Sequence, residues 1–118
     1  MALNKVCKGD KLPYANASGV DIASGSPVLV GKIFGVACVN IADGETENLD
    51  IEGVYEIRKV TGAITQGADL YWDADGNPVG GPSGTGALTT TSSGNTYAGR
   101  AYAAATETAA TVQIKLNA

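Results

Sequence analysis

The sequence predicts an all-β fold: a compact single-domain β-barrel or tulip-like sandwich of short antiparallel strands, with little or no helix. Apolar residues recur at every second position in several segments, and turn signals rich in Gly, Asn and Asp separate these segments. No window combines helix-capping residues with an apolar stripe at positions i, i+3 and i+4. The spacing of the turn signals predicts roughly seven to nine strands.

The N-terminal residues differ from the rest of the chain. Residues 1–10 show no alternating pattern and carry more basic than acidic side chains, whereas the first convincing strand signal begins at about Lys11. We therefore expect residues 1–10 to form an N-terminal arm and residues 11–118 to form one β-domain. Two glycine-bounded apolar runs follow, SPVLV (residues 26–30) and IFGVACV (residues 33–39), which are typical of strands buried on both faces or lying at a barrel closure.

Two later segments alternate between apolar and polar residues. Residues 49–57 predict one half-buried strand with an acidic outer face, and TVQIKL (residues 111–116) predicts another. Between them, NTYAGRAYAAA (residues 95–105) is rich in alanine, but Gly99 and the preceding Gly94-Asn95 turn favour a strand over a helix. The positions expected to face the core are Leu49, Ile51, Tyr55, Ile57, Val112, Ile114 and Leu116.

The segment GADLYWDADGN (residues 67–77) contains the only Trp of the chain and three Asp residues, so it raises the question of a calcium site. If Gly76 occupied position 6 of a calcium loop, Asp73 and Asp75 would fall at ligand positions 3 and 5. Positions 1 and 12 would then hold Tyr71 and Pro82, which supply no carboxylate. The sequence therefore predicts no metal site here.

A β-hairpin explains the same segment with fewer requirements. Asp75-Gly76 can occupy the positive-φ positions of a tight turn, with apolar residues before it and Pro78-Val79 after it. Adjacent strand residues point to opposite faces, so we expect one of Tyr71 and Trp72 to enter the core and the other to face a loop, water or a partner. Tyr71 and Trp72 are accordingly the candidate residues for an oligomer or surface contact.

A faint internal repeat runs through the sequence. GSPVLV and IFGVA are similar in order to GADLYW and YAGRA, with Gly25 matching Gly67 and Gly35 matching Gly99. The identities are few, so chance similarity is an alternative. A true repeat would favour a closed, pseudo-symmetric β-barrel.

Composition narrows the classes of function. Hydrophobic residues make up 44% of the chain, many of them alanine, and the net charge is -4, so we expect a folded domain with a lean core that gains stability by association. The pI of about 4.5 and eight basic residues argue against nucleic-acid binding. No apolar run is long enough for a secretory signal or a membrane span, which predicts a chain that is kept in a cytoplasm or released by lysis and has no membrane contact.

Catalytic and cofactor motifs fail on inspection. The chain has no His, and Cys7 and Cys38 lack metal-ligand spacing and are more typical of idle thiols than of a disulfide. SPVLVGKI (residues 26–33) misses both the first glycine and the final hydroxyl of a phosphate-binding loop. Paired carboxylates such as Glu52 and Glu56 fall on an exposed strand face, where burial cannot raise their pKa. The sequence therefore predicts neither an enzyme nor a cofactor.

Several segments together resemble a known family. The ordered series GSPVLVGKIFGVAC, LDIEGVYEIRKVTG, ITQGADLYWD and GNTYAGRAYAAATETAATVQIKLN is similar to the small capsid decoration, or cement, proteins of tailed bacteriophages and prophages. The family pattern is matched by a strand with Gly67, Asp69, Leu70, Tyr71, Trp72 and Asp73, and by a closing block with Gly94, Asn95, Thr96, Gly99 and Ala101. The chain departs from it by inserting Ala68 and by a glycine-rich loop at residues 80–86.

The resemblance implies a structural virion protein on the outer surface of the phage head, present in the host cytoplasm during assembly. It implies binding to the major capsid protein, head stabilisation against internal DNA pressure and self-association, often as trimers, with no catalytic residues. The basic arm would then add a strand to a capsid subunit, and its candidate contact residues are Leu3, Lys5, Val6 and Lys8. The alternative is a carbohydrate- or surface-binding β-domain in which Trp72 and exposed Tyr side chains act as stacking platforms.

Overall fold

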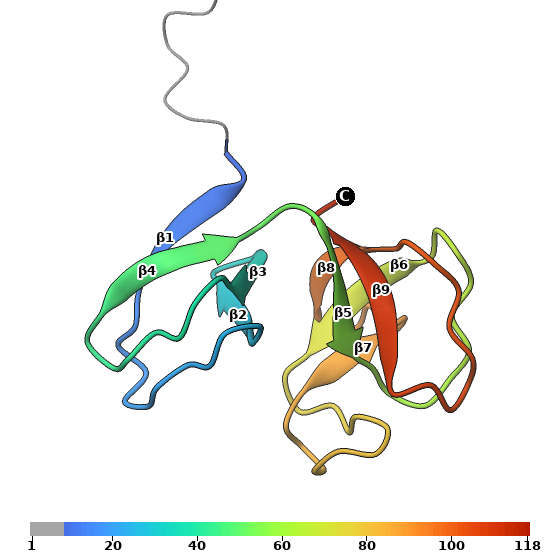
Figure 1. Ribbon diagram of the computed structural model, residues 1–118. Helices are drawn as coiled ribbons and strands as arrows, with labels where there is room; N and C mark the ends of the chain where they lie inside the picture. The colour runs from blue at the N-terminus through green and yellow to red at the C-terminus, as the bar shows by residue number, and fades with distance from the viewer. Residues whose placement is uncertain (1–8) are drawn as a thin grey trace, which may run out of the picture.

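The computed structural model describes residues 9–118, which form nine antiparallel strands in two curled sheets (Figure 1). No helix occurs in this part of the chain. The predicted all-β class and the number of strands are confirmed. The predicted arm residues Leu3, Lys5, Val6 and Lys8, and with them Cys7, lie outside the described residues.

The N-terminal sheet contains four strands in the order β1-β4-β3-β2. The hairpin between β2 and β3 has a two-residue loop, in which Gly31 takes a φ of 59°. A glycine with positive φ at the first loop position is typical of a type II′ hairpin turn, whose twist matches that of the flanking strands. The strands are β1 (Lys11–Ala15), β2 (Pro27–Val30), β3 (Ile33–Ala37) and β4 (Thr46–Asp50).

The C-terminal sheet contains five strands in the order β5-β9-β8-β6-β7 and curls until its two edges meet. Lys59, just after β5, forms a parallel bridge with Leu88 of β7, and the Val60 N–H donates to the Leu88 carbonyl at 3.0 Å. This bridge closes the sheet into a small barrel, as barrel closure requires. The strands are β5 (Val54–Arg58), β6 (Asp69–Asp73), β7 (Ala87–Thr89), β8 (Thr96–Ala101) and β9 (Thr111–Leu116).

The alternating segment 49–57 is not the single strand that its pattern predicts. It contains the end of β4 and most of β5, which belong to different sheets, and the chain crosses between them at residues 51–53 (Figure 1). Gly53 has a φ of 113°, a conformation that ends regular strand geometry. The apolar alternation continues across the break because Leu49 and Ile57 are each buried in their own sheet.

The tight hairpin that the sequence predicts at residues 67–77 is wrong, because no strand follows directly after Gly76. Strands β6 and β7 do pair, with Asp73 opposite Ala87, so the connection is the long segment 74–86 and Val79 is not in a strand. Neither Asp75 nor Gly76 has a positive φ. Gly76 instead allows close packing of the backbone, since a Cβ there would lie 3.1 Å from the Ala87 nitrogen and 3.1 Å from the Asp73 carbonyl oxygen.

Two clusters of buried side chains form the core. The larger fills the C-terminal barrel and also takes in Phe34 and Val36 from β3, so both sheets contribute to it. The smaller contains only Ala37, Ile41 and Leu49 as buried members and lies on the other face of the N-terminal sheet. The Asn117 side-chain amide fastens the two sheets by donating to the carbonyls of Phe34 at 2.9 Å and Ile51 at 2.7 Å.

The internal repeat suggested by the sequence is present in the hydrogen-bond pattern. Omitting β7, the strand orders β1-β4-β3-β2 and β5-β9-β8-β6 are the same. Matching backbone bonds have matching lengths: the N–H of Gly25 donates to Ala37 and that of Gly67 to Ala101, both at 2.8 Å. The bridge between Ile22 and Ile41 recurs between Ile64 and Ala105.

The repeat extends to two buried polar residues that follow the first strand of each half. The Asn16 N–H donates to the Glu45 carbonyl, and the Lys59 N–H donates to the Ala110 carbonyl, at corresponding places in the ladders. The halves differ by an insertion, because a two-residue turn joins β2 to β3 whereas residues 74–95, which include β7, join β6 to β8. The chain is therefore built from two topologically equal halves, and only the second has a fifth strand.

Candidate interaction surfaces

The described residues form several surfaces and polar networks that could contact a partner. Within residues 9–118, no three or more His, Cys, Asp or Glu side chains are grouped so that they could hold a metal ion. The same stretch contains no helix long and apolar enough to cross a membrane. The features to consider are the outer face of the C-terminal sheet, a cavity beside Arg58, and two polar networks.

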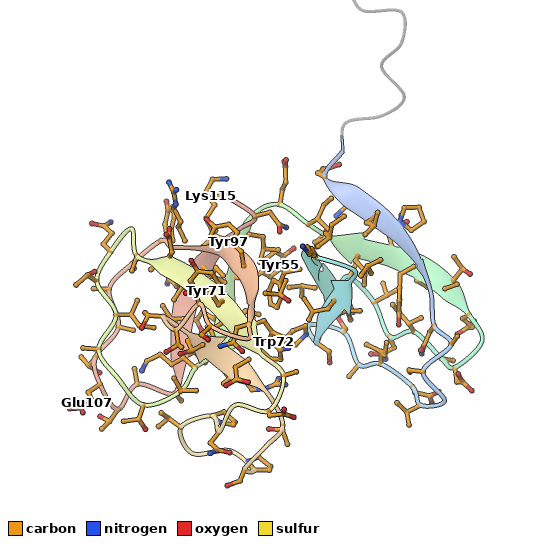
Figure 2. The ribbon with its side chains drawn as sticks, turned by 180° about the vertical axis from the view of Figure 1, so that it is seen from behind. Tyr55, Tyr71, Trp72, Tyr97, Glu107 and Lys115 are labelled. Carbon is orange, nitrogen blue, oxygen red and sulfur yellow. The ribbon has the colours of Figure 1, made fainter. Side chains whose placement is uncertain are left out.

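On the outside of the C-terminal sheet, Tyr71, Tyr97 and Lys115 lie near one another (Figure 2). Together with Arg100, which pairs with Lys115, they define what we call the outer face. Tyr71 and Tyr97 are opposite each other on β6 and β8, and their rings meet edge to face with centroids 5.6 Å apart. Arg100 pairs in register with Lys115 and forms an ion pair with Asp69 at 3.1 Å. The outer face thus combines two half-buried rings with the exposed Lys115 cation and an Arg100–Asp69 ion pair, a mixture of apolar and charged groups that suits contact with another protein.

Trp72 lies on the opposite side of β6, in the core. Its side chain is 8% exposed and packs against the Phe34 ring, with centroids 5.6 Å apart. The Arg58 guanidinium lies 5.1 Å from the Trp72 ring centroid, a cation–π distance. Trp72 therefore has little surface to offer a partner or a sugar, and the predicted surface contact rests on Tyr71 alone.

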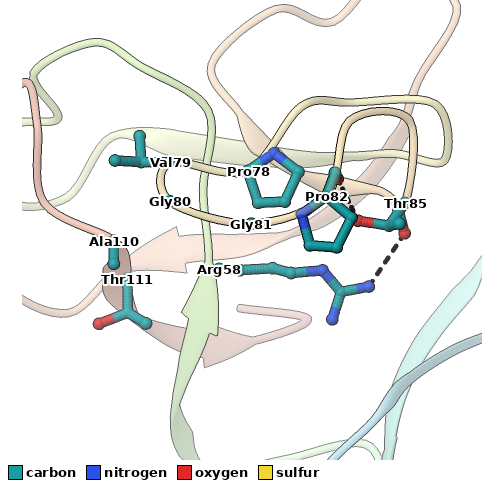
Figure 3. A pocket seen from close by; sticks show the side chains of 9 residues that line it. All are labelled: Arg58, Pro78, Val79, Gly80, Gly81, Pro82, Thr85, Ala110 and Thr111. Carbon is teal, nitrogen blue, oxygen red and sulfur yellow. Dashed lines mark hydrogen bonds between the residues drawn. The ribbon is translucent and has the colours of Figure 1, made fainter.

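A shallow cavity of about 430 Å³ lies between Arg58 and the proline-containing loop (Figure 3). Its Arg58 side chain is already committed, because Nε donates to the Gly86 carbonyl at 2.7 Å and a terminal nitrogen donates to the Thr85 carbonyl at 3.0 Å. The cavity thus combines apolar walls with the hydroxyls of Thr85 and Thr111. The lining residues are Arg58, Pro78, Val79, Gly80, Gly81, Pro82, Thr85, Ala110 and Thr111.

A polar network spans the junction of the two halves. Asp50, at the end of β4, receives hydrogen bonds from the Lys11 ammonium and the Tyr55 hydroxyl, so it links β1, β4 and β5. Burial and the bond to Asp50 raise the pKa of Tyr55 to about 12. Burial alone would raise the pKa of Asp50, but the Lys11 and Tyr55 hydrogen bonds outweigh it and lower that pKa. The network keeps Asp50 charged and Tyr55 neutral.

Lys59 is fully buried, and its ammonium is enclosed by backbone carbonyls. Nζ donates to the carbonyls of Val60 at 3.0 Å, Gly62 at 2.9 Å and Glu107 at 3.3 Å. Burial lowers the pKa of Lys59, and the nearby Glu107 carboxylate opposes that shift. A cation held by three carbonyls fastens the residue 59–62 turn to the residue 107 loop, which makes Lys59 a structural clasp.

Sequence reasoning missed both networks, each for its own reason. Lys59 follows another basic residue, Arg58, and two adjacent basic residues usually indicate an exposed segment. Asp50 and Tyr55 fall on opposite faces of the single strand predicted at residues 49–57, but they belong to two different strands. The signal that could have found Lys59 is the internal repeat, since it aligns Lys59 with Asn16 at the end of an equivalent strand. A buried polar residue in both halves is a stronger indication than a single lysine in a loop.

The fold and its surfaces define a class: a small, all-β structural or binding protein built from two related sheets, with an exposed aromatic and basic face. Residues 6–116 match the family model described as phage cement protein. The match covers nearly the whole chain, so the protein belongs to the phage cement protein family. Searches of the curated proteins and of the solved structures found no match.

Proposed function

We propose that this protein binds the outer surface of a phage head and stabilises the shell against the pressure of packed DNA. Membership of the cement family, which makes it a structural protein of the phage capsid, is the observation that carries the proposal. Packed DNA strands repel one another because of their dense negative charge, and this repulsion loads the shell from inside. A subunit that bridges capsomers adds contact area across seams that would otherwise open.

The outer face is the proposed contact with the major capsid protein. Lys115 is exposed and Arg100 is 59% exposed at its side chain, and both lie beside the edge-to-face tyrosine pair. Partly buried tyrosines supply contact area at small entropic cost, while cations steer the approach to an acidic shell. The sheet behind this face is a closed barrel, so the face is presented by a rigid support.

Charge reversal on this face tests the contact. Undecorated heads are mixed with wild-type protein, with Lys115→Glu, or with Lys32→Glu, which changes the charge equally in the exposed β2–β3 turn. We expect Lys115→Glu to reduce the bound copies per head at least about tenfold, as for a charge pair worth 1.4 kcal/mol or more, and Lys32→Glu to bind normally. Equal binding by both variants would exclude the outer face, and no binding by the wild type would exclude the head as partner.

The second proposed contact is the N-terminal arm, residues 1–10. Its basic side chains Lys5 and Lys8 would be attracted to an acidic shell, and an extended arm can add a strand to an exposed sheet edge. Deleting residues 2–8 should leave the subunit folded and abolish binding to undecorated heads. A deletion variant that decorates heads normally would contradict this contact.

Self-association, with a trimer as the expected state, is the third part of the proposal. A trimer that engages several seams gains avidity because its second and third contacts become intramolecular.

Stabilisation of the head is tested separately. Heads decorated with the protein should retain DNA at temperatures at which bare heads release it. Decorated and bare heads that release DNA at the same temperature would refute stabilisation while leaving binding intact.

A further inference from the structure

Within residues 9–118, the N-terminal sheet has no counterpart of β7, the fifth strand of the C-terminal sheet. Among the described residues, β2 has a strand neighbour on one side only, β3, whereas its counterpart β6 lies between β8 and β7. The two halves otherwise share strand order and backbone hydrogen bonds. The C-terminal half therefore serves as a template for a strand that could pair with the free edge of β2.

In the C-terminal half, β7 completes the core as well as the sheet. Leu88 is fully buried, pairs with Trp72 of β6 and bridges to Lys59 beyond β5. One leucine thus covers the interior of the barrel and joins its two edges. The sequence of this short strand is Ala87-Leu88-Thr89, a small residue, a leucine and a small polar residue.

The N-terminal half has an open core at the equivalent place. Through the repeat, Val28 and Val30 of β2 correspond to Leu70 and Trp72 of β6, yet both valines are only half-buried. They flank the small cluster, which contains just three buried residues, against twelve in the large one. An added strand carrying one large apolar side chain would cover these valines and supply the burial that Leu88 supplies in the other half.

The chain itself contains a second segment of the β7 type. Its only other Ala-Leu pair is Ala2-Leu3, followed by the polar Asn4. We propose that residues 2–4 of a second copy add as a strand to the free edge of β2, with Leu3 in the position that Leu88 takes on β6. Pro27 lacks an N–H, but pairing on β6 begins at Tyr71, the counterpart of Leu29, so the proline does not interfere.

Geometry favours a second copy over the same chain. Leu88 sits beside Lys59, and the counterpart of Lys59 is Asn16, at the opposite end of β1 from Asp10. Within one chain, residues 5–10 would have to run back along all of β1, about 17 Å for five strand residues. Six residues reach at most about 20 Å, which leaves almost no slack.

The arrangement is head-to-tail, since the arm of one copy occupies the edge of the next. Such a contact forms a closed ring when the rotation between copies closes, which is compatible with a trimer. Residues 5–8 would then cross between two copies, leaving Lys5, Val6 and Lys8 for the head and assigning Leu3 to the neighbouring copy. The free protein suffices to test this, so the outcome does not depend on head binding.

Disulfide trapping tests the register directly. In a chain with Cys7→Ser and Cys38→Ser, the pair Leu3→Cys and Val30→Cys is oxidised at micromolar concentration. Opposed residues of antiparallel strands lie about 4.5–5.5 Å apart at Cα, within the range of a disulfide. The matched control replaces Val30→Cys by Val54→Cys, a valine that is 43% exposed on the other sheet and therefore more open to random collision.

We expect disulfide-linked oligomers with Val30→Cys and almost none with Val54→Cys. A link within one chain, no link, or equal linking in both variants would overturn the proposal. Sedimentation equilibrium supplies the second measurement: the wild type should be oligomeric and a folded Leu3→Asp variant monomeric at the same concentration. A monomeric wild type, or an oligomeric Leu3→Asp variant, would also overturn it.

Discussion

The two halves of this protein show how one topology can be completed in two ways. The C-terminal half closes on itself through β7 and encloses its own core. In the part of the chain that the structure describes, the N-terminal half lacks that strand and has a cluster of only three buried apolar residues on one face. On its other face, Phe34 and Val36 pack into the large cluster. One half is therefore a closed barrel whose core also takes in two side chains of the other half, and the other half is an open sheet that packs against it.

Equivalent positions in the two halves have also taken different chemistry for the same task. Asn16 and Lys59 are both buried after the first strand, and each binds backbone carbonyls through its side-chain nitrogen. The amide of Asn16 also accepts hydrogen bonds from Ser18, which the ammonium of Lys59 cannot do. Both halves therefore need a buried side-chain nitrogen that donates hydrogen bonds at this position. Only the N-terminal half also uses the side chain as an acceptor.

The two halves should differ most in the stability cost of replacing the equivalent glycines, Gly99 of β8 and Gly35 of β3. A Cβ on Gly99 would lie 2.1 Å from the Lys115 carbonyl oxygen, and Gly99 has a φ of 152°. Gly99→Ala must therefore part β8 from β9, and we expect a loss of about 4 kcal/mol or more in the free energy of unfolding, or no folded protein. Urea denaturation measures it.

Gly35→Ala is the matched variant in the other half. Its Cβ would lie 3.1 Å from Cβ and 3.2 Å from Cδ1 of the buried Leu49, a crowding that a shift of a few tenths of an ångström would relieve, and its φ is outside the left-handed region. We expect a cost of about 1–2 kcal/mol. Equal costs for the two variants would show that the glycines are equivalent in energy as well as in position.

The buried donors give the next largest effect. Lys59→Met keeps most of the side-chain volume but removes all three hydrogen bonds to the carbonyls of residues 60, 62 and 107. Leaving buried carbonyls without a donor should lower the free energy of unfolding by about 3 kcal/mol. Asn16→Leu should cost a comparable amount. If Lys59→Met left the free energy of unfolding unchanged, the buried ammonium and its hydrogen bonds would not be required for stability.

The junction of the halves should respond to alkaline pH. The pKa of Tyr55 is raised from 10.0 to about 12, so the folded state holds the phenol proton more tightly than the unfolded state does. Its contribution is complete below pH 10 and is lost between pH 10 and 12. Two pKa units correspond to about 2–3 kcal/mol.

Tyr55→Phe isolates this contribution, because Lys11 and Cys38 also have raised pKa values and lose stability in the same direction. Urea denaturation at several pH values should show the wild type more stable than the variant at pH 8, with the difference shrinking as the pH rises above 10. A difference that stays constant would mean that Tyr55 stabilises the junction through packing alone.

The sequence predicted the strands well where one strand has one buried face. The alternation of residues 111–116 matches β9 position by position, because this strand is covered on one side only. It failed at residues 49–57, where alternation continues through a sheet crossover that only Gly53 marks, and at residues 74–86, where the strand after the turn lies farther on than Val79. Local pattern carries no information on which sheet a strand joins.

The outer face could be predicted only in part, because local sequence pattern also carries no information on which strands lie next to each other. Alternation showed that Tyr71 and Trp72 face opposite ways, but not which ring is buried, since that depends on Phe34 and Arg58 from distant strands. Arg100 and Lys115 became neighbours only through the register of β8 with β9. Pairing between strands far apart in sequence is therefore the information that the outer face required.

The smallest expected effect concerns Gly25 and Gly67, and it tests the equivalence of the halves most directly. Both have a φ of 85°, and a Cβ on either would meet nothing within 4 Å. Only backbone strain then opposes alanine, so Gly25→Ala and Gly67→Ala should each cost about 1–2 kcal/mol, and the same within error. Urea denaturation of both variants measures the pair. A larger cost at Gly67 would mean that the closed barrel resists backbone adjustment more than the open sheet does, because a ring of paired strands cannot relax at one turn without disturbing the next.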